Sequence, residues 1–545
     1  MTRPLLIVGV DGLPPTFLQR LIDGGRMPTF ARLARDGALG VLRSTPNYQS
    51  ASAWSSFATG VNPGQHGVFH FTNPVRGSYR FAQIDARARC SPTIWRMLSD
   101  AGIRVAALNV PVSYPAEAIG GVMVAGWLCP SAASAGFTHP PEVARGLTEY
   151  PIHPEVRRHA STGDYAAVAH HARRGILAKL ELARLILLQE RPDILCVVVT
   201  ETDSLQHWCW HLLDAGHPEH RPHLADRWRD ELLAPYEALD HALGGLLHAA
   251  GKCTDLMVVS DHGQSPNSGG QLLLRPWLIH RGYLVPARRT IRQRVSDAIM
   301  RAGFEAIRRH AGNRLKSRLR ARFPEMQARA QAGVRGVAAE WPRTRAWTEC
   351  GHIFINTRGT WPQGCVEPGP ERTALLEELR EGLLDLRDAE TGEPAVASVT
   401  FGDHEFAGSQ ADLMADLLVH WRTDLRITRL RDADGTVIER PDAPEVPFGA
   451  HHPDGTLVTC GPSFAPIDDA REHSIYDVAP TALHLLGQPV PAHFDGHVMT
   501  DLMAVAAAKD VRSMAVNVTS DRPRPRPVGD DAIVTERLRS LGYIE

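Results

Sequence analysis

The stretch "LLIVGVDG" at residues 5–12 is a short apolar run that ends on an acidic residue and a glycine. A run of this length, rich in branched side chains, is typical of a strand buried on both faces. Two later stretches repeat the design, "ILCVVVTETD" at 194–203 and "DLMVVSDHG" at 255–263. Because helical patterns separate such strands, the sequence predicts an α/β fold with a mainly parallel central sheet flanked by helices. Side chains that carry function should then lie just beyond the carboxyl ends of the strands.

The rest of the chain extends this pattern and interrupts it once. Helices are expected at 15–23, 28–36 and 224–251, and further strands at 105–113, 121–127, 352–357, 416–421 and 457–462. Between about 287 and 340 the sequence is rich in arginine and has no strand signal, which indicates either a solvated helical insertion or a cap that turns positive charge toward an anionic substrate. We therefore divide the chain into the first part of a catalytic core (1–286), an Arg-rich helical and mixed insertion or cap (287–400), the second part of the core (401–510) and an extended tail with a short C-terminal helix (511–545).

Composition excludes several classes of function. With 545 residues and a formal net charge of -2, the chain shows no bias toward nucleic acid or an anionic membrane. No segment approaches the roughly 18 to 20 apolar residues of a membrane span, and the N-terminal apolar run is too short for a signal peptide. Eight cysteines without a C-x-x-C motif indicate neither a disulfide framework nor a zinc ribbon. We expect a cytoplasmic protein that binds neither nucleic acid nor membrane, and leave a homo-oligomer open.

Acidic residues and histidines gather at the predicted strand ends. The residues are Asp11, Asp203, His207, Asp261, His262, His451 and His452. Each has an ordinary structural explanation when it is considered alone, such as a helix cap or a surface histidine. Together they are hard to explain by packing, because buried carboxylates need a compensating partner. Carboxylate oxygen and imidazole nitrogen suit zinc and, to a lesser degree, manganese or iron.

The order and spacing of these motifs resemble the alkaline phosphatase superfamily. The most similar branch is the type I phosphodiesterase and nucleotide pyrophosphatase group, with its bacterial predicted phosphohydrolase or phosphomutase relatives. The motifs that carry the resemblance cover nearly the whole chain and are "LLIVGVDG", "SASAWSSFATGVNPGQHGVFHF", "ETDSLQHW", "VVSDHG", "WPRTRAW", "GAHHPDGTLVTCGP", "SIYDVAPTALHLLGQPVPAHFDG" and "RLRSLGYIE". An alkaline-phosphatase-like core is the fold that this resemblance implies.

The resemblance also implies a nucleophile and two metal sites. In the family a Ser or Thr nucleophile precedes the Thr of a Thr-Gly pair by nine residues, which here selects Ser50. One divalent ion would be held by Asp11, Asp261, His262 and the Ser50 oxygen, and the other by Asp203, His207 and His451. Zinc is expected for both, with manganese or iron as alternatives. The implied reaction is attack by Ser50 on phosphorus, loss of an alcohol or phosphate, and hydrolysis of phospho-Ser50 by water.

The sequence departs from the family pattern beside this nucleophile. Nucleotide pyrophosphatases carry an Asn three residues after it, where this chain has Ala53, so nucleotide specificity is not implied. We expect substrate contacts from Asn47 and Trp54 instead, and from His452, which stands where the family has Arg. A formylglycine sulfatase is not expected, because the required Pro and Arg are absent. We expect His66 and His473 to have structural roles and leave His70 open between a structural role and the pocket.

The sequence therefore predicts a dinuclear-metal hydrolase that cleaves a small-molecule phosphate ester, with a phosphodiester favoured. The alternatives within enzymes are a phosphomonoesterase or phosphonate-ester hydrolase, and a phosphomutase or phosphoryl transferase. Outside enzymes, the alternative is a metal-binding regulatory protein with little turnover.

Overall fold

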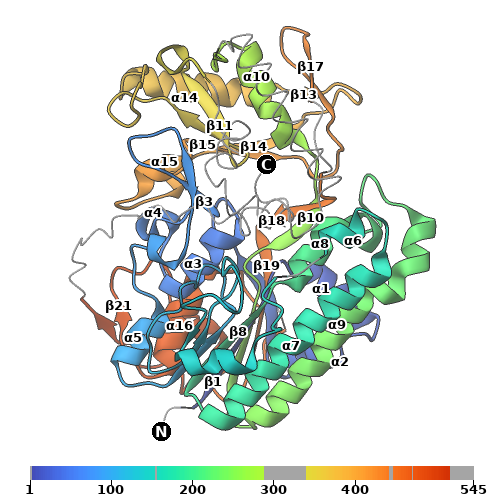
Figure 1. The fold of residues 1–545 in the computed structure, drawn as a ribbon, viewed down its shortest axis with the longest axis vertical. Coiled ribbons are helices and arrows are strands. Elements are labelled where there is room, and N and C mark those ends of the chain that lie inside the picture. The colour runs from blue at the N-terminus through green and yellow to red at the C-terminus, as the bar shows by residue number, and fades with distance from the viewer. Residues whose placement is uncertain (1–2, 154–155, 288–338, 441–445, 469, 516–545) are drawn as a thin grey trace.

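A computed structural model describes residues 3–153, 156–287, 339–440, 446–468 and 470–515 (Figure 1). The helices that we expected within the Arg-rich segment, and the expected C-terminal tail and helix, fall mainly on 288–338 and 516–545 and lie outside the described residues. Within the described ranges, no helix has both the length and the apolar character needed to cross a membrane.

The centre of the molecule is a nine-stranded sheet. Its strands are β1 (Leu5–Val10), β2 (Ala38–Arg43), β5 (Val105–Leu108), β6 (Gly121–Val124), β7 (Thr138–His139), β8 (Ile194–Val199), β9 (Asp255–Val259), β19 (Asp454–Cys460) and β20 (His473–Ser474). They lie in the order β20-β2-β19-β9-β1-β8-β5-β6-β7. Strands β9, β1, β8, β5 and β6 are mutually parallel, and β19 and β7 run antiparallel to their neighbours. The predicted α/β fold with a mainly parallel sheet is confirmed.

Helices cover both faces of this sheet (Figure 1). One group is α1 (Pro15–Asp23), α2 (Pro28–Asp36), α6 (Arg157–Ala160), α7 (Tyr165–Glu190), α8 (Glu201–Leu213) and α9 (Pro222–Ala250), and the other is α3 (Ser50–Thr59), α4 (Pro63–His66), α5 (Ile94–Asp100) and α16 (Val478–Leu485). Alternation along β1 explains why two cores form. Leu6 and Val8 enter the core beneath the first group, whereas Leu5 and Ile7 enter the core beneath the second.

A second lobe lies above the carboxyl ends of the central strands (Figure 1). We use this name for the four-stranded sheet β11-β12-β15-β14 and the elements packed on it. Its elements are α10 (Leu274–His280), β11 (Ala346–Glu349), β12 (His352–Ile355), α14 (Pro370–Leu384), β14 (Val396–Phe401), α15 (Gly402–Glu405) and β15 (Leu417–Trp421), with a small sheet of β13 (Arg387–Asp388), β16 (Arg429–Arg431) and β17 (Val437–Glu439). Its apolar core draws on residues from Leu273 to Leu284 and from Ala346 to Ile438.

Three two-stranded sheets complete the structure. They pair β3 (Thr72–Pro74) with β4 (Phe81–Gln83), β10 (Gly263–Pro266) with β18 (Gly449–His452), and β21 (Val490–Pro491) with β22 (Ser513–Met514). The β3–β4 hairpin reaches from the core into the second lobe, where Tyr79 stacks flat on Trp341 with ring centroids 3.5 Å apart. The β10–β18 pair lies at the base of the second lobe, above β19 (Figure 1).

Gly9 in the centre of β1 allows us to test how tightly helix α3, which begins at Ser50, packs on the sheet. A Cβ at this position would lie 2.5 Å from Trp54 of α3 and 2.8 Å from Val198 of β8. We expect Gly9→Ala to lower the free energy of unfolding by about 1–3 kcal/mol, as overpacking does. Gly245→Ala is the matched control, because a Cβ there meets nothing within 4 Å. Gly245 lies inside α9, where the change to alanine should raise the free energy of unfolding by about 0.5–1 kcal/mol. Denaturant unfolding measures both, and a neutral Gly9→Ala would contradict the close packing.

Candidate active site

Adjacent parallel strands bring three carboxylates together at one edge of the sheet. Asp11 follows β1 directly, Asp261 follows β9, and Asp203 lies in the first turn of α8 after β8. Since β9, β1 and β8 are neighbours, their carboxyl ends meet. Gly12 allows the loop after β1 to pass close to Asp203. Its φ is 72°, and a Cβ there would lie 3.1 Å from the Cα of Asp203.

Hydrogen bonds tie the loops after these strands to one another. The Thr202 hydroxyl donates to the Asp11 carbonyl at 2.6 Å, and the Leu13 amide donates to the Ser260 hydroxyl at 2.8 Å. The Gly12 amide also donates to Asp261 Oδ1 at 3.3 Å. The positions of the carboxylates are therefore set by backbone as well as by side-chain contacts.

Three histidines face the carboxylates, and their backbone contacts orient them in the same way. Each Nδ1 lies against a backbone carbonyl, at 2.9 Å from Gly449 for His207, 2.9 Å from Gly263 for His262 and 2.8 Å from Tyr48 for His451. A carbonyl only accepts, so each Nδ1 carries the hydrogen. In its neutral form, each ring would therefore present the Nε2 lone pair to the carboxylates, as metal-binding histidines do.

His207, His451 and Asp203 form one compact group. The two Nε2 atoms are 3.0 Å apart, and they lie 3.2 and 3.6 Å from Asp203 Oδ1, respectively. Two lone pairs at this separation repel each other unless a proton or a cation lies between them. Carboxylate and imidazole ligands in this number are what zinc prefers.

The second group surrounds His262 Nε2. Ser50 Oγ lies 2.9 Å from it, Asp261 Oδ2 3.3 Å and Asp11 Oδ1 3.5 Å. Ser50 is the first residue of α3, and its side chain is fully buried. Burial and the nearby His451 hold the pKa of His262 well below its usual value, so its ring is neutral, the form that binds metals.

The electrostatics of these groups fit bound cations. Asp11 Oδ1 and Asp261 Oδ2 are buried, and no residue that the structure describes donates a hydrogen bond to them. Burial and the neighbouring carboxylates raise the pKa of Asp11 and of Asp261 well above the ordinary value. Burial acts the same way on Asp203, but attraction to His207 and His451 outweighs it and lowers the pKa of Asp203. Divalent ions would satisfy the bare oxygens and balance the charge.

The structure groups the predicted metal ligands slightly differently from the grouping that the sequence predicted. Asp203, His207 and His451 have ligand atoms within 4.8 Å of one another, as do Asp11, Asp203 and His262. Asp203 thus stands between the two groups, whereas the sequence placed it in one. The structure brings all seven predicted ligands together, Ser50 and Asp261 through their contacts with His262. Their roles as ligands stay a prediction.

A third group of possible ligands lies in the second lobe. His280 Nε2 is 3.5 Å from Asp432 Oδ2 and 3.1 Å from Asp434 Oδ2. The guanidinium of Arg281 lies 3.7 Å from the same Asp432 oxygen and already compensates its charge. We therefore interpret this group as an ion-pair cluster.

The three predicted substrate contacts occupy different environments. Trp54 is fully buried, and its indole Nε1 donates to Asp11 Oδ2 at 3.0 Å. The amide of Asn47 donates to the Phe69 carbonyl at 2.6 Å and accepts from Ser52 at 2.8 Å. His452 lines the cavity described below. Trp54 and Asn47 thus have partners inside the protein, and of the three only His452 lines the cavity.

The sequence predicted structural roles for His66 and His473 and left the role of His70 open. His66 Nε2 lies 2.9 Å from the Ser56 hydroxyl, and its Nδ1 accepts from the Val68 amide, so this ring orders the loop after α3. His473 Nδ1 lies 3.9 Å from Asp477 Oδ2, and its Nε2 lies 3.3 Å from Asp501 Oδ2. His70 is buried, and burial and the nearby His451 lower its pKa to about 3.

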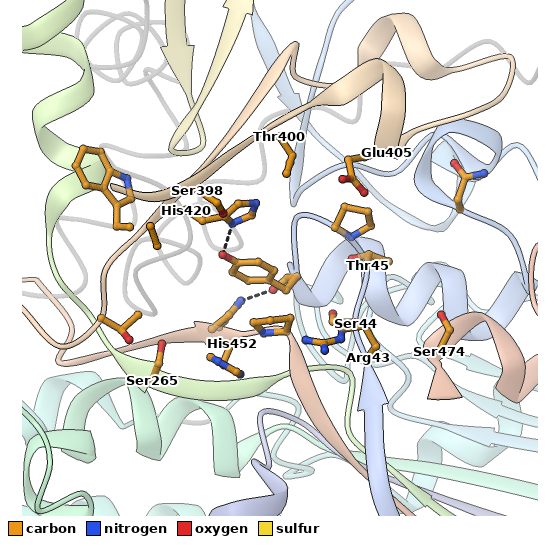
Figure 2. Close-up of a pocket in the computed structure, with 18 of the residues that line it drawn as sticks. Arg43, Ser44, Thr45, Ser265, Ser398, Thr400, Glu405, His420, His452 and Ser474 are labelled. Atoms are coloured by element: carbon orange, nitrogen blue, oxygen red, sulfur yellow. Dashed lines mark hydrogen bonds between the residues drawn. The ribbon is translucent and has the colours of Figure 1, made fainter. Parts of the chain in front are cut away.

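A cavity of about 970 Å³ opens between the core and the second lobe (Figure 2). His451 lines it, so the cavity reaches the group formed with Asp203 and His207. Arg43, Ser44, Thr45 and His452 form the core side, and Ser398, Thr400 and His420 form the side of the second lobe (Figure 2). A ligand held at the strand ends could therefore extend into a polar cleft.

Tyr48 is a site residue that the sequence did not indicate. It lines the cavity and offers its backbone carbonyl to His451. A carbonyl is present in every residue, so no motif marks this role.

Ser50 is buried at the carboxyl edge of a mainly parallel sheet and faces carboxylates and imidazoles, which is the arrangement that the resemblance to the alkaline phosphatase superfamily implied. Residues 5–345 match the type I phosphodiesterase / nucleotide pyrophosphatase family, and the chain belongs to this family. This confirms the resemblance in the sequence.

The fold resembles that of a solved structure at a TM-score above 0.5. Phosphonoacetate hydrolase from Sinorhizobium meliloti, in complex with phosphonoformate, is 16% identical with a TM-score of 0.51, over 89% of this chain and 95% of that one. Murine ectonucleotide pyrophosphatase / phosphodiesterase 5, in complex with AMP, is 13% identical with a TM-score of 0.45, over 92% of this chain and 100% of that one. A comparison with curated proteins finds no match.

The raised pKa values of Asp11 and Asp261 predict how the metal-free protein responds to pH. A carboxyl whose pKa is raised by folding stabilises the native state while it is protonated, and this contribution is lost as the pH rises from the ordinary value of 3.8 through the raised value. At neutral pH without metal, Asp261→Asn should therefore raise the melting temperature by removing a repelling charge. With zinc the order should reverse, because a ligand is lost.

Asp255→Asn is the matched control, since Asp255 lies at the opposite end of β9 and accepts from the Ser463 amide at 2.8 Å. Its effect on the melting temperature should be the same with and without zinc. A destabilised Asp261→Asn protein in the absence of metal would contradict the repulsion that we infer.

Proposed function

We propose that this protein hydrolyses small-molecule phosphate esters, phosphodiesters above all, with Ser50 as nucleophile and two divalent ions, zinc in the first instance. The observation that carries the proposal is the placement of Ser50 Oγ 2.9 Å from His262 Nε2, at the start of α3 and among buried carboxylates. Membership of the phosphodiesterase family supports the reaction class. Bound divalent ions would lower the pKa of the serine hydroxyl and neutralise charge that develops on the phosphoryl group.

The chain's own residues supply the nucleophile and a binding site for the phosphoryl group. Ser50 Oγ forms a bond to phosphorus while the bond from phosphorus to the leaving alcohol breaks, and the alcohol departs with a proton. Water then attacks phosphorus, the bond to Ser50 breaks, and the serine regains its proton. The products are a phosphomonoester and an alcohol.

The start of α3 offers a substitute for the Asn that the family has at the position of Ala53. Amides in the first turn of a helix have no acceptor within the helix, and they point toward its N-terminal end. In α3 these are the amides of Ser50, Ala51 and Ser52, since the Ala53 amide already donates to the Gln49 carbonyl. We propose that they bind a phosphoryl oxygen, as helix N-termini do.

The cavity favours a diester over a compact monoester or phosphonate. Its volume of about 970 Å³ leaves room beyond the phosphoryl group for a sizeable alcohol. Its two arginines are already engaged: Arg43 with Asp454 and Glu472, and Arg422 with Asp424 and Glu393. A phosphodiester, which carries one negative charge, therefore suits this cleft better than a monoester or phosphonate that carries two.

The test compares bis-p-nitrophenyl phosphate with p-nitrophenyl phosphate, with added zinc or manganese. We expect faster turnover of the diester and a fall of at least about 1,000-fold in kcat for Ser50→Ala. Ser55→Ala is the matched control on the same helix and should keep activity, since its buried hydroxyl has no hydrogen-bond partner among the described residues. Release of nitrophenol is followed by absorbance.

The alternatives give different results in the same assay. Transfer of the phosphoryl group to an added alcohol, far above hydrolysis, would replace the proposal with a phosphoryl transferase. Preference for the monoester would indicate a phosphomonoesterase. Two bound zinc ions without turnover of any ester would indicate a metal-binding protein rather than an enzyme.

A further inference from the structure

Tyr48 joins three parts of the molecule that meet at the site. It lies two residues before Ser50, and its carbonyl accepts a hydrogen bond from His451 Nδ1 at 2.8 Å. Its phenol is hydrogen-bonded to Nδ1 of His420 on β15 of the second lobe (Figure 2). The two rings also stack, with centroids 5.3 Å apart and planes 30° from parallel. The second lobe thus reaches a predicted metal ligand through one residue.

The backbone of Tyr48 needs such support. Its φ is 31°, on the left-handed side that a bulky residue avoids, so neighbouring contacts must hold it there. Within the loop, the Tyr48 amide donates to the Thr45 carbonyl at 2.8 Å. His420 is the side chain that holds the phenol: its Nδ1 is hydrogen-bonded to the Tyr48 hydroxyl, and burial lowers its pKa to about 4, so the ring is neutral.

We propose that Tyr48 is a positioning residue for His451, anchored by His420. With the phenol held by the second lobe, the Tyr48 carbonyl stays against His451 Nδ1 and directs Nε2 of that ring toward Asp203 and His207. Partners that orient a metal-binding histidine contribute strongly to metal affinity. This inference rests on the proposed metal site, but it concerns how the ligand is held rather than the reaction.

Zinc titration of the metal-free protein tests the proposal without measuring activity. Tyr48→Phe keeps the ring and removes the hydroxyl, and His420→Phe removes the hydrogen-bond partner of that hydroxyl. Each should lower affinity for one of two zinc ions by about 10- to 100-fold and leave the other unchanged. The double variant should be no weaker than either single variant, because all three lose the same bond. In His420→Gln, whose amide oxygen can accept, affinity should be partly restored.

Tyr476→Phe is the matched control, since Tyr476 lines the same cavity and its hydroxyl makes no hydrogen bond to a predicted ligand in the part of the chain that the structure describes. It should bind zinc as the wild type does. Cobalt in place of zinc adds a spectroscopic readout, and its visible spectrum should change in Tyr48→Phe but not in Tyr476→Phe.

Zinc affinity and a cobalt spectrum equal to the wild type in folded Tyr48→Phe or His420→Phe would overturn the inference. Thermal melting establishes that each variant is folded, and His420→Phe carries the test if Tyr48→Phe does not fold. A wild type that binds two zinc ions but cleaves no ester would refute the proposed function and leave this test intact. A wild type that binds no zinc would refute both.

Discussion

The burial of three carboxylates at one edge of a parallel sheet is the constraint on which the rest of the structure depends. Asp11, Asp203 and Asp261 follow neighbouring strands, and nothing in the packing of those strands requires charge there. Like charges in a buried site raise one another's pKa and oppose folding unless a cation compensates them. Gly12 and the hydrogen bonds between the loops nevertheless hold the carboxylates together. Electrostatic repulsion between buried carboxylates that the fold keeps in place is typical of a functional site.

Much of this site could be predicted from the sequence because strand ends are visible in it. An apolar run that stops at Asp11 or at Asp261–His262 marks both the strand and the point where its last side chain emerges. Parallel order then brings such points together. One other aspect of the site could not be read from residue types. The carbonyls that orient the histidines belong to Tyr48, Gly449 and Gly263, and only the folded chain shows which ones are used.

Trp54 shows how a departure from a family pattern can have a physical explanation that the sequence alone does not reveal. The sequence placed it next to a missing phosphate-binding Asn and therefore suggested a substrate contact. In the structure the indole is buried against Gly9 of β1 and donates to Asp11. Gly9 leaves room for the ring, and the ring orients a predicted metal ligand. Two motifs far apart in the chain, "VGVDG" and "SAW", thus act as one unit.

Ser50, the proposed nucleophile, is connected to the second lobe on both sides of its helix. Before α3, Tyr48 is bound to His420, and after α3 the chain places Phe69 in the apolar core of the second lobe. The β3–β4 hairpin then adds Tyr79, which stacks on Trp341. Because Ser50 lies between these anchors, the lobe that forms the far wall of the cavity is also tied to the reacting group. Relative movement of the two lobes would therefore displace Ser50, so these anchors help to hold the proposed nucleophile in one position.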